Sequence, residues 1–295
     1  MSANKSYGVQ SMIGNIRRIL LKRPEDAFIS QAHLAENYAR FNYFGCPDFE
    51  TVLREYDRFE TIIKQHVEEV LYLPHDGRTG LDSIYTHDSL KITKQGAVYF
   101  NMGKELRRGE AGAAREFLES AGVPTCGVIE APATIEGGDV LWIDEDTVAI
   151  GRGYRTNDEA IRSFIALTKD TVKEHIIVPM PHADGRDACL HLMSLISFVD
   201  TDKAVVYSKY MPVFFRELLI DRGFRLFEVS DEEYERLGSN LLALSPGKCV
   251  LIEGCPEIQG ALEAAGVEIF TYPGSELSIK GTGGPTCLTC PVWRE

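Results

Sequence analysis

The sequence of 295 residues predicts a single-domain α/β protein, and three observations support this prediction. Apolar residues recur at helical spacing in five segments, and each segment is followed by a short apolar run typical of a strand. Short strands paired as hairpins are predicted between these units, whereas a simple doubly wound parallel sheet would lack them. No low-complexity segment or Pro/Ser-rich linker divides the chain, so residues 1–295 are assigned to one domain.

The first unit combines a short strand with a long helix. Three consecutive apolar residues predict a buried strand at 19–21, which ends before Pro24. Apolar side chains at helical spacing predict an amphipathic helix over 49–70, and the strand 70–74 is predicted after it. The aromatic and glycine-rich residues 42–48 are expected to form a surface connection, with a lid over a binding site as the alternative.

Four further units repeat the order of helix and strand without obvious sequence identity between them. The predicted helices span residues 110–121, 157–168, 212–222 and 256–265. The strands that follow them span residues 126–129, 175–179, 226–229 and 267–271. Two hairpins are predicted, one pairing 139–143 with 147–151 and the other pairing 241–244 with 249–253.

The composition argues against several functional classes. The formal net charge of -13 is unlike that of a general nucleic-acid binder, which normally presents a basic face or stripe. No run approaches the roughly 18 apolar residues that a membrane-spanning helix needs. The first residues contain no apolar signal core, so a cytoplasmic location is expected. A closed homodimer is the commonest assembly in general, and no residue pattern selects one here.

Cofactor and metal motifs are absent from the sequence. No Gly-x-Gly-x-x-Gly follows a predicted strand and no phosphate-binding loop motif occurs, so a nucleotide cofactor has no support. Cys287 and Cys290 have the spacing of a zinc half-site, but no second ligand pair accompanies them. A redox dithiol of the thioredoxin type opens a helix, whereas Pro291 follows this pair. Seven scattered cysteines do not form the pattern of a secreted disulfide framework.

Three features can carry chemistry. A glycine-rich stretch, residues 281–286, leads to Cys287, whose thiol is a candidate nucleophile. His191 stands out as an ionisable ring in the apolar, strand-like segment 187–200, where a satisfied core histidine is the alternative. Two carboxylates flank two glycines in Glu136-Gly-Gly-Asp139, where a tight turn with solvated acids is the alternative.

At these residues the sequence resembles the guanidino-group-modifying superfamily, which contains arginine deiminases, amidinotransferases and dimethylarginine dimethylaminohydrolases. The Glu136-Gly-Gly-Asp139 motif, His191-Leu-x-Ser and the loop carrying Cys287 occur in the order found in that superfamily. Residues 82–88, 106–110 and 151–157 resemble segments of the dimethylarginine hydrolases in particular. The resemblance implies a five-bladed α/β propeller, the pentein fold, with five ββαβ units around a pseudo-fivefold axis. It also implies a central active site without metal or cofactor.

The resemblance further implies the roles of the reacting groups. Cys287, as the thiolate, attacks the central carbon of a guanidinium group. His191 protonates the departing amine and then activates the water that hydrolyses an S-alkylthiouronium intermediate. A bound cation beside Cys287 lowers the pKa of the thiol.

Carboxylates and arginines are expected to hold the substrate. By resemblance, Asp88 and Glu136 bind the guanidinium, and Asp82 assists at the amino-acid end. Arg107 and Arg155 bind the α-carboxylate, a task that suits the planar fork of arginine. For both arginines a surface ion pair is the alternative, and for Arg107 the sequence favours neither interpretation.

The substrate is the least determined part of the prediction. Arginine deiminases generally show His-x-Asp, whereas Met193 stands at the position of that aspartate, which favours the dimethylarginine hydrolases. The residues around Cys287 look closer to a deiminase. The expected function is a metal-free cysteine hydrolase that acts on (methyl)arginine or a related guanidine and releases citrulline and an amine. The alternatives are an arginine deiminase, an amidinotransferase and a non-catalytic binding protein on the same scaffold.

Overall fold

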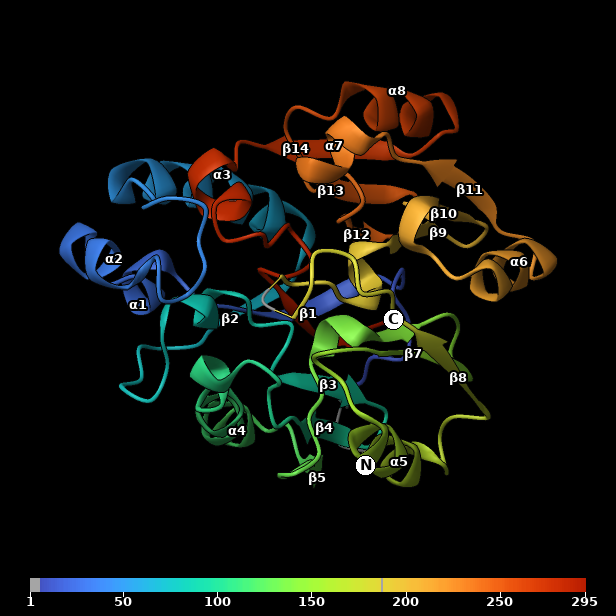
Figure 1. Ribbon diagram of the computed structural model, residues 1–295, viewed down its shortest axis with the longest axis horizontal. Coiled ribbons are helices and arrows are strands. Elements are labelled where there is room, and N and C mark those ends of the chain that lie inside the picture. Colours follow the sequence, from blue (N-terminus) through green and yellow to red (C-terminus); the bar gives the residue numbers. More distant parts are fainter. Residues whose placement is uncertain (1–5, 187) are drawn as a thin grey trace.

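Five three-stranded sheets surround the centre of the molecule in the computed structural model, which describes residues 6–186 and 188–295 (Figure 1). In every sheet the middle strand pairs antiparallel with one neighbour and parallel with the other. The first strand of each sheet lies toward the centre, and the helices lie at the periphery. This arrangement is the five-bladed α/β propeller that the resemblance implies, so the predicted fold class is confirmed.

Four units are continuous in the chain, and each runs strand, strand, helix, strand. They consist of β3 (Leu90–Thr93), β4 (Gly96–Tyr99), α4 (Glu110–Ser120) and β5 (Thr125–Val128); β6 (Val140–Trp142), β7 (Thr147–Arg152), α5 (Asp158–Thr168) and β8 (Glu174–Pro179); β9 (Ile196–Asp200), β10 (Lys203–Val206), α6 (Val213–Asp221) and β11 (Arg225–Glu228); and β12 (Leu242–Ser245), β13 (Lys248–Ile252), α8 (Pro256–Ala264) and β14 (Glu268–Tyr272). The short connection makes the first pair antiparallel, and the crossover helix makes the second pair parallel.

The remaining unit is assembled from two distant parts of the chain. Its first strand is β15 (Cys290–Arg294), which pairs antiparallel with β1 (Ile16–Leu21). The crossover after β1 contains α1 (Pro24–Ala27), α2 (Gln31–Asn37) and α3 (Phe49–His66), and it leads to β2 (Glu69–Tyr72), parallel to β1. The pairing of β15 with β1 therefore closes the ring of five sheets.

Short helical turns precede the first strands of the sheets. They are η1 (Leu81–Ile84), η3 (Gly137–Asp139), η4 (Leu192–Ser194), α7 (Asp231–Glu235) and the π-helical turn η6 (Ser275–Ile279), while η2 (Glu105–Arg107) and η5 (Ser208–Tyr210) lead into α4 and α6. Because each first strand lies near the centre, the segments that lead into these strands converge there.

Most predicted elements agree with the structure within a few residues. The helix predicted over 49–70 ends earlier, at His66, because residues 69–72 belong to β2. Both predicted hairpins are present as β6–β7 and β12–β13, and two more, β3–β4 and β9–β10, were not predicted. The strand-like interpretation of 187–200 is partly wrong, since residue 187 lies outside the described part and the strand begins only at Ile196. The assignment of residues 1–295 to one domain stays a prediction.

The connection at residues 42–48 packs against the segment that precedes β15. The backbone N–H of Phe44 donates a hydrogen bond to the carbonyl of Lys280 (2.7 Å), and the Tyr43 ring is buried beside Gly281. The Phe44 side chain itself is exposed. The connection therefore covers part of the loop that carries Cys287, and its role as a lid stays a prediction.

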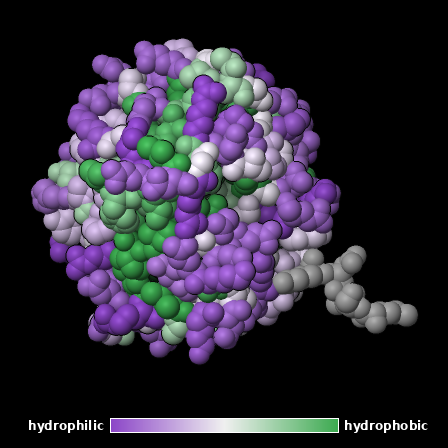
Figure 2. Space-filling view, turned by 90° about the vertical axis from the view of Figure 1, so that its right-hand side faces the viewer, coloured by the Kyte–Doolittle hydropathy of each residue, from purple (hydrophilic) through white to green (hydrophobic). Residues whose placement is uncertain are grey.

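Apolar side chains also gather on part of the surface. A band of them crosses the face shown in Figure 2, on which purple hydrophilic residues otherwise dominate. Helix α6 lies on this side of the molecule and exposes Val213, Phe214 and Ile220. Within the described residues, no helix has the length and apolar character needed to cross a membrane. The homodimer stays a prediction.

Candidate active site

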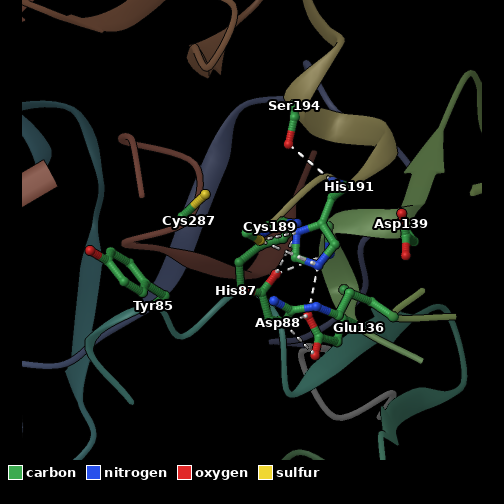
Figure 3. Close-up of polar contacts among 12 residues, drawn as sticks. Tyr85, His87, Asp88, Glu136, Asp139, Cys189, His191, Ser194 and Cys287 are labelled. Atoms are coloured by element: carbon green, nitrogen blue, oxygen red, sulfur yellow. Dashed lines mark hydrogen bonds and ion pairs between the residues drawn. The ribbon is translucent and has the colours of Figure 1, made fainter. Parts of the chain in front are cut away.

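Each of the five units places one polar side chain in the segment just before its first strand. Asp88 stands two residues before β3, Glu136 four residues before β6, and His191 five residues before β9. Asn240 stands two residues before β12, and Cys287 three residues before β15. The ring of sheets thus brings together residues that are up to 199 positions apart. Figure 3 shows Asp88, Glu136, His191 and Cys287 in one site.

The His191–Glu136 pair forms the buried centre of this site. The His191 ring donates a hydrogen bond from Nε2 to Glu136 Oε2 at 2.7 Å, and Glu136 is fully buried. Gly138 permits this contact, because a Cβ at that position would lie 2.4 Å from His191 Nδ1. The backbone N–H of His191 donates to Ser194 Oγ, which fixes the start of η4. The second glycine of the Glu136-Gly-Gly motif is therefore needed for the close approach of the imidazole.

His191 and Glu136 each stabilise the charged form of the other. Burial alone would raise the pKa of Glu136, but the hydrogen bond and charge of His191, together with Arg155, hold the pKa far below its usual value. Burial opposes protonation of His191, and the neighbouring Cys189, Asp88 and Glu136 outweigh it, so the pKa of His191 is well above its usual value. An ionised carboxylate thus faces an imidazolium that can act as a general acid.

Asp139 has a structural role in the same motif. Its Oδ1 accepts a hydrogen bond from the backbone N–H of Leu192 (2.9 Å), and its Oδ2 accepts one from Thr156 Oγ1 (2.6 Å). Burial raises the pKa of Asp139 to about 6. The carboxyl group ties the segment before β6 to the turn that carries His191, so the tight-turn alternative with solvated acids does not describe this motif.

Asp88 is bound to an arginine of the protein itself. Arg107 Nη1 donates to Asp88 Oδ2 at 2.7 Å, and the backbone N–H of Gly138 donates to Asp88 Oδ1 at 3.1 Å. The other side of the Arg107 guanidinium makes two hydrogen bonds to Glu110, at 3.0 and 2.9 Å. Arg107 is buried and lies between two carboxylates. The ion-pair alternative therefore describes its contacts, although the pair is in the interior and not at the surface.

Arg155 and Lys104 both contact Glu136, and Lys104 also contacts Asp82. Arg155 Nη1 lies 3.2 Å from both oxygens of Glu136, and the backbone N–H of Lys104 donates to Glu136 Oε1 at 2.9 Å. Lys104 Nζ forms an ion pair with Asp82 at 2.6 Å. Asp82 is thus brought next to the site through Lys104, a residue that the sequence did not single out.

Cys287 lies on the glycine-rich loop, opposite the imidazole. Its sulfur accepts a hydrogen bond from Asn240 Nδ2 at 3.2 Å, and within the described residues no hydrogen bond joins it to His191. Burial, with the nearby charge of Asp88, raises the pKa of the Cys287 thiol to about 12. The free protein therefore holds the thiol in its protonated form at neutral pH, and a cation bound between Cys287 and His191 would favour the thiolate.

Two further cysteines lie near these groups with different surroundings. Cys189 is exposed, and its sulfur lies 3.7 Å from His191 Nδ1. Cys290 is buried at the start of β15, and all seven cysteines are free. Within residues 6–186 and 188–295, no group of three or more His, Cys, Asp or Glu side chains is arranged to hold a metal ion.

The sequence did not reveal Asn240, Lys104 or Cys189 as neighbours of the site. Lys104 and Cys189 carry no motif, and their positions depend on the packing of loops from different units. Asn240 does have a signal, because it stands at the same offset from β12 as Asp88 does from β3. That signal becomes visible only when the start of each first strand is known.

The five-bladed fold with its central polar site is that of the guanidino-group-modifying superfamily. The family model for arginine deiminase matches residues 82–223 and 214–294, so the chain belongs to the arginine deiminase family. Arginine deiminase of Mycobacterium avium is 32% identical over 192 residues, which are 55% of this chain and 47% of that protein. The chain therefore spans about half the length of the deiminases that it matches.

Other relatives match over nearly the whole chain. The uncharacterized protein YkgA of Bacillus subtilis is 27% identical over 282 residues, which cover 95% of this chain and 93% of YkgA. The structure of DDAH from Pseudomonas aeruginosa with citrulline has a TM-score of 0.74 at 21% identity, covering 94% of this chain and 99% of that one. The N-terminal domain of ArgZ, a cyanobacterial arginine dihydrolase, has a TM-score of 0.77 at 18% identity, covering 95% and 98%. These structural likenesses concern the fold.

Proposed function

We propose that the protein is a metal-free cysteine hydrolase of a substituted guanidine, with methylated arginine as the preferred substrate class and citrulline and an amine as products. The observation that carries the proposal is the convergence of the Cys287 thiol with the buried His191–Glu136 pair. A nucleophile and a proton donor oriented by a third group are what cleavage of an unreactive C–N bond requires. A non-catalytic binding protein would not need this arrangement.

The first half of the reaction forms a covalent intermediate. When the substrate cation binds, the Cys287 thiol releases its proton to solvent, and the thiolate adds to the guanidinium carbon to give a neutral tetrahedral adduct. The C–N bond then breaks as the imidazolium of His191 transfers its proton to the departing amine. An S-alkylthiouronium cation remains on Cys287, and the ionised Glu136 balances the charge of the site throughout.

The second half releases the product. Neutral His191 takes a proton from water, and the resulting hydroxide adds to the thiouronium carbon. The adduct expels the Cys287 thiolate, its hydroxyl proton leaves to solvent, and the carbon becomes the ureido group of citrulline. His191 is again protonated, the Cys287 thiolate regains a proton from solvent as the product leaves, and the cycle closes with one water consumed.

Binding of the substrate cation requires a rearrangement at Glu136. Every oxygen of Asp88 and Glu136 already accepts a hydrogen bond from the protein. The contacts of Arg155 with Glu136, at 3.2 Å, are the longest among them. We expect Arg155 to leave Glu136 and bind the substrate carboxylate, while Arg107 stays between Asp88 and Glu110. Asp82 and Lys104 then face the amino-acid end.

The preference for a substituted nitrogen rests on Met193. This side chain is buried in the apolar cluster between β6–β8 and β9, β10 and α6, so the segment after His191 contributes no second carboxylate at this position. A guanidine nitrogen that carries methyl groups does not need such a partner. Arginine itself is the second candidate substrate, because the deiminases match the chain at 30% identity or more over about half its length.

Product analysis separates the candidates. The protein is incubated with arginine, monomethylarginine and asymmetric dimethylarginine, and citrulline, ammonia and alkylamine are measured. Citrulline with alkylamine is expected, and Cys287→Ser should abolish it while Cys290→Ser, three residues further on at the start of β15, should retain it. Citrulline with ammonia alone would identify a deiminase, and transfer to an added amine would identify an amidinotransferase. No citrulline from any of the three substrates would overturn the proposal.

A further inference from the structure

We propose that Asn240 is the hydrogen-bond donor that orients the sulfur of Cys287 and stabilises its thiolate. The assignment rests on the proposed function, in which Cys287 is the nucleophile. It adds a catalytic group that neither the motifs nor the comparisons assign.

The contact itself is direct. Asn240 Nδ2 lies 3.2 Å from Cys287 Sγ, and within residues 6–186 and 188–295 no other hydrogen-bond donor contacts this sulfur. The imidazole of His191 does not contact the sulfur, so it does not form a thiolate–imidazolium contact pair with Cys287 in this structure. Asn240 is therefore the group that can compensate a negative charge on the sulfur before the substrate arrives.

The orientation of the Asn240 amide is determined by its other contacts. Asn240 Oδ1 accepts a hydrogen bond from the backbone N–H of Thr286 at 3.0 Å, so the NH₂ end must face the sulfur. The Thr286 hydroxyl donates to the carbonyl of Leu241 at 2.7 Å, which ties the same two segments together again. The amide thus bridges the segment before β12 to the residue that precedes Cys287.

The loop sequence is adapted to this bridge. A Cβ at Gly284 would lie 2.6 Å from Asn240 Oδ1 and 2.7 Å from its Cγ, so only glycine leaves room for the amide. Asn240 is 93% buried, with 7% of its surface exposed, which removes competition from water for the sulfur. One of the glycines that mark the loop in the sequence is therefore explained by the position of Asn240.

The symmetry of the fold supports the same assignment. Four of the five segments that lead into first strands supply Asp88, Glu136, His191 and Cys287, which have roles in the proposed reaction. The fifth supplies Asn240, at the same offset from β12 as Asp88 has from β3. Every unit of the ring then contributes one group to the reaction.

The expected size of the effect follows from the chemistry of the contact. A hydrogen bond to a charged group is strong enough to lower the pKa of that group by about one to two units. Removing the donor should therefore raise the pKa of Cys287 by about one to two units, and at a pH below that pKa it should slow alkylation of the thiol about 10- to 100-fold. A carboxylate at the same place should raise the pKa further, because it repels the thiolate.

The test measures the thiol without using turnover. Wild type, Asn240→Ala and Asn240→Asp are alkylated with iodoacetamide at several pH values from 7 to 9. This range lies below the pKa of Cys287, so the alkylation rate is proportional to the thiolate fraction. The rate of modification of the Cys287 peptide is measured by mass spectrometry. Ser239→Ala is the matched control, since Ser239 hydrogen-bonds the carbonyl of Ser194 from the same segment and does not touch the sulfur. Circular dichroism checks the fold of each variant, and Asn240→Asp, which keeps the acceptor for Thr286, serves if Asn240→Ala does not fold.

The expected result is alkylation of Cys287 about 10- to 100-fold slower in Asn240→Ala than in wild type, slower still in Asn240→Asp, and unchanged in Ser239→Ala. Unchanged rates in folded Asn240 variants, or an equal loss of rate in Ser239→Ala, would overturn the assignment. Alkylation needs no guanidine substrate. If the Asn240 variants are alkylated more slowly as expected but the wild-type protein produces no citrulline, the proposed function is wrong and the role of Asn240 stands.

Discussion

Replacing Glu136 by glutamine removes the carboxylate that faces His191 and keeps the length of the side chain. The contact between His191 Nε2 and Glu136 Oε2, 2.7 Å long, is a charge-assisted hydrogen bond between two buried groups. Such a bond contributes about 1.5–3 kcal/mol. The substitution should therefore lower the pKa of His191 by about one to two units.

The contribution of the His191–Glu136 pair to the free energy of unfolding should also depend on pH. The folded pKa of Glu136 is below the usual glutamate value of 4.5, so the contribution of Glu136 to stability is fully present above pH 4.5 and is lost as the pH falls through the folded pKa. The folded pKa of His191 is above the usual histidine value of 6.5, so the contribution of His191 is fully present below pH 6.5 and is lost as the pH rises through the folded pKa. The stability difference between wild type and Glu136→Gln should be largest between these two values.

Urea unfolding from pH 3 to 9 measures this difference, and the NMR titration of His191, assigned with His191→Asn, measures its pKa. Glu116→Gln is the control, because Glu116 pairs with Arg78 on the surface, where an ion pair contributes about 0–1 kcal/mol. A difference that stays constant across the pH range, or an unchanged His191 pKa, would refute the reasoning.

Two further substitutions test the motif around this pair. Gly138→Ala places a Cβ 2.4 Å from His191 Nδ1 and should lower turnover by about 10²-fold, because the imidazole ring is displaced. A turnover above one tenth of that of wild type would contradict the packing argument. Gly112→Ala is the control, since a Cβ there meets no atom closer than 3.7 Å. Asp139 has its pKa raised by burial from 3.8 to about 6, so its ionisation in the folded protein costs stability as the pH rises between these values. Asp139→Asn should flatten this fall, which is on the order of 3 kcal/mol, and an unchanged slope in urea unfolding would show that Asp139 is ionised at low pH.

Much of the fold could be predicted because its helices have one apolar face. Helices α3 and α5 bury apolar residues at regular spacing, and their bounds were predicted within a few residues. The β3–β4 hairpin was missed because each strand has only four residues and both faces are buried, so Lys91 and Thr93 stand at interior positions where polar residues are not expected. The start of β9 was misplaced because the apolar residues after His191 read as one strand, whereas Ser194 closes a separate helical turn first.

The candidate site was predictable where a motif exists and unpredictable where only packing defines it. Cys287, His191 and Glu136 stand in recognisable short motifs, and the structure brings them together. Arg107 carries no local mark that distinguishes a substrate-binding arginine from a buried ion pair, since its partner Asp88 comes from another segment. Asn240 has no sequence motif of its own, and it stands out only when its distance from β12 is compared with that of Asp88 from β3.

The pairing of β15 with β1 has a consequence for biosynthesis. On the ribosome, β1 emerges early and must wait for nearly all of the remaining strands before its antiparallel partner exists. Such long-range pairing is intrinsically slow, and the nascent chain exposes an unpaired strand edge until then. The loop that carries Cys287 is made immediately before β15, so Cys287 is translated only after all strands of the other four sheets. The thiol and the strand that closes the ring thus enter the chain together, and a nascent chain that stops before them lacks both.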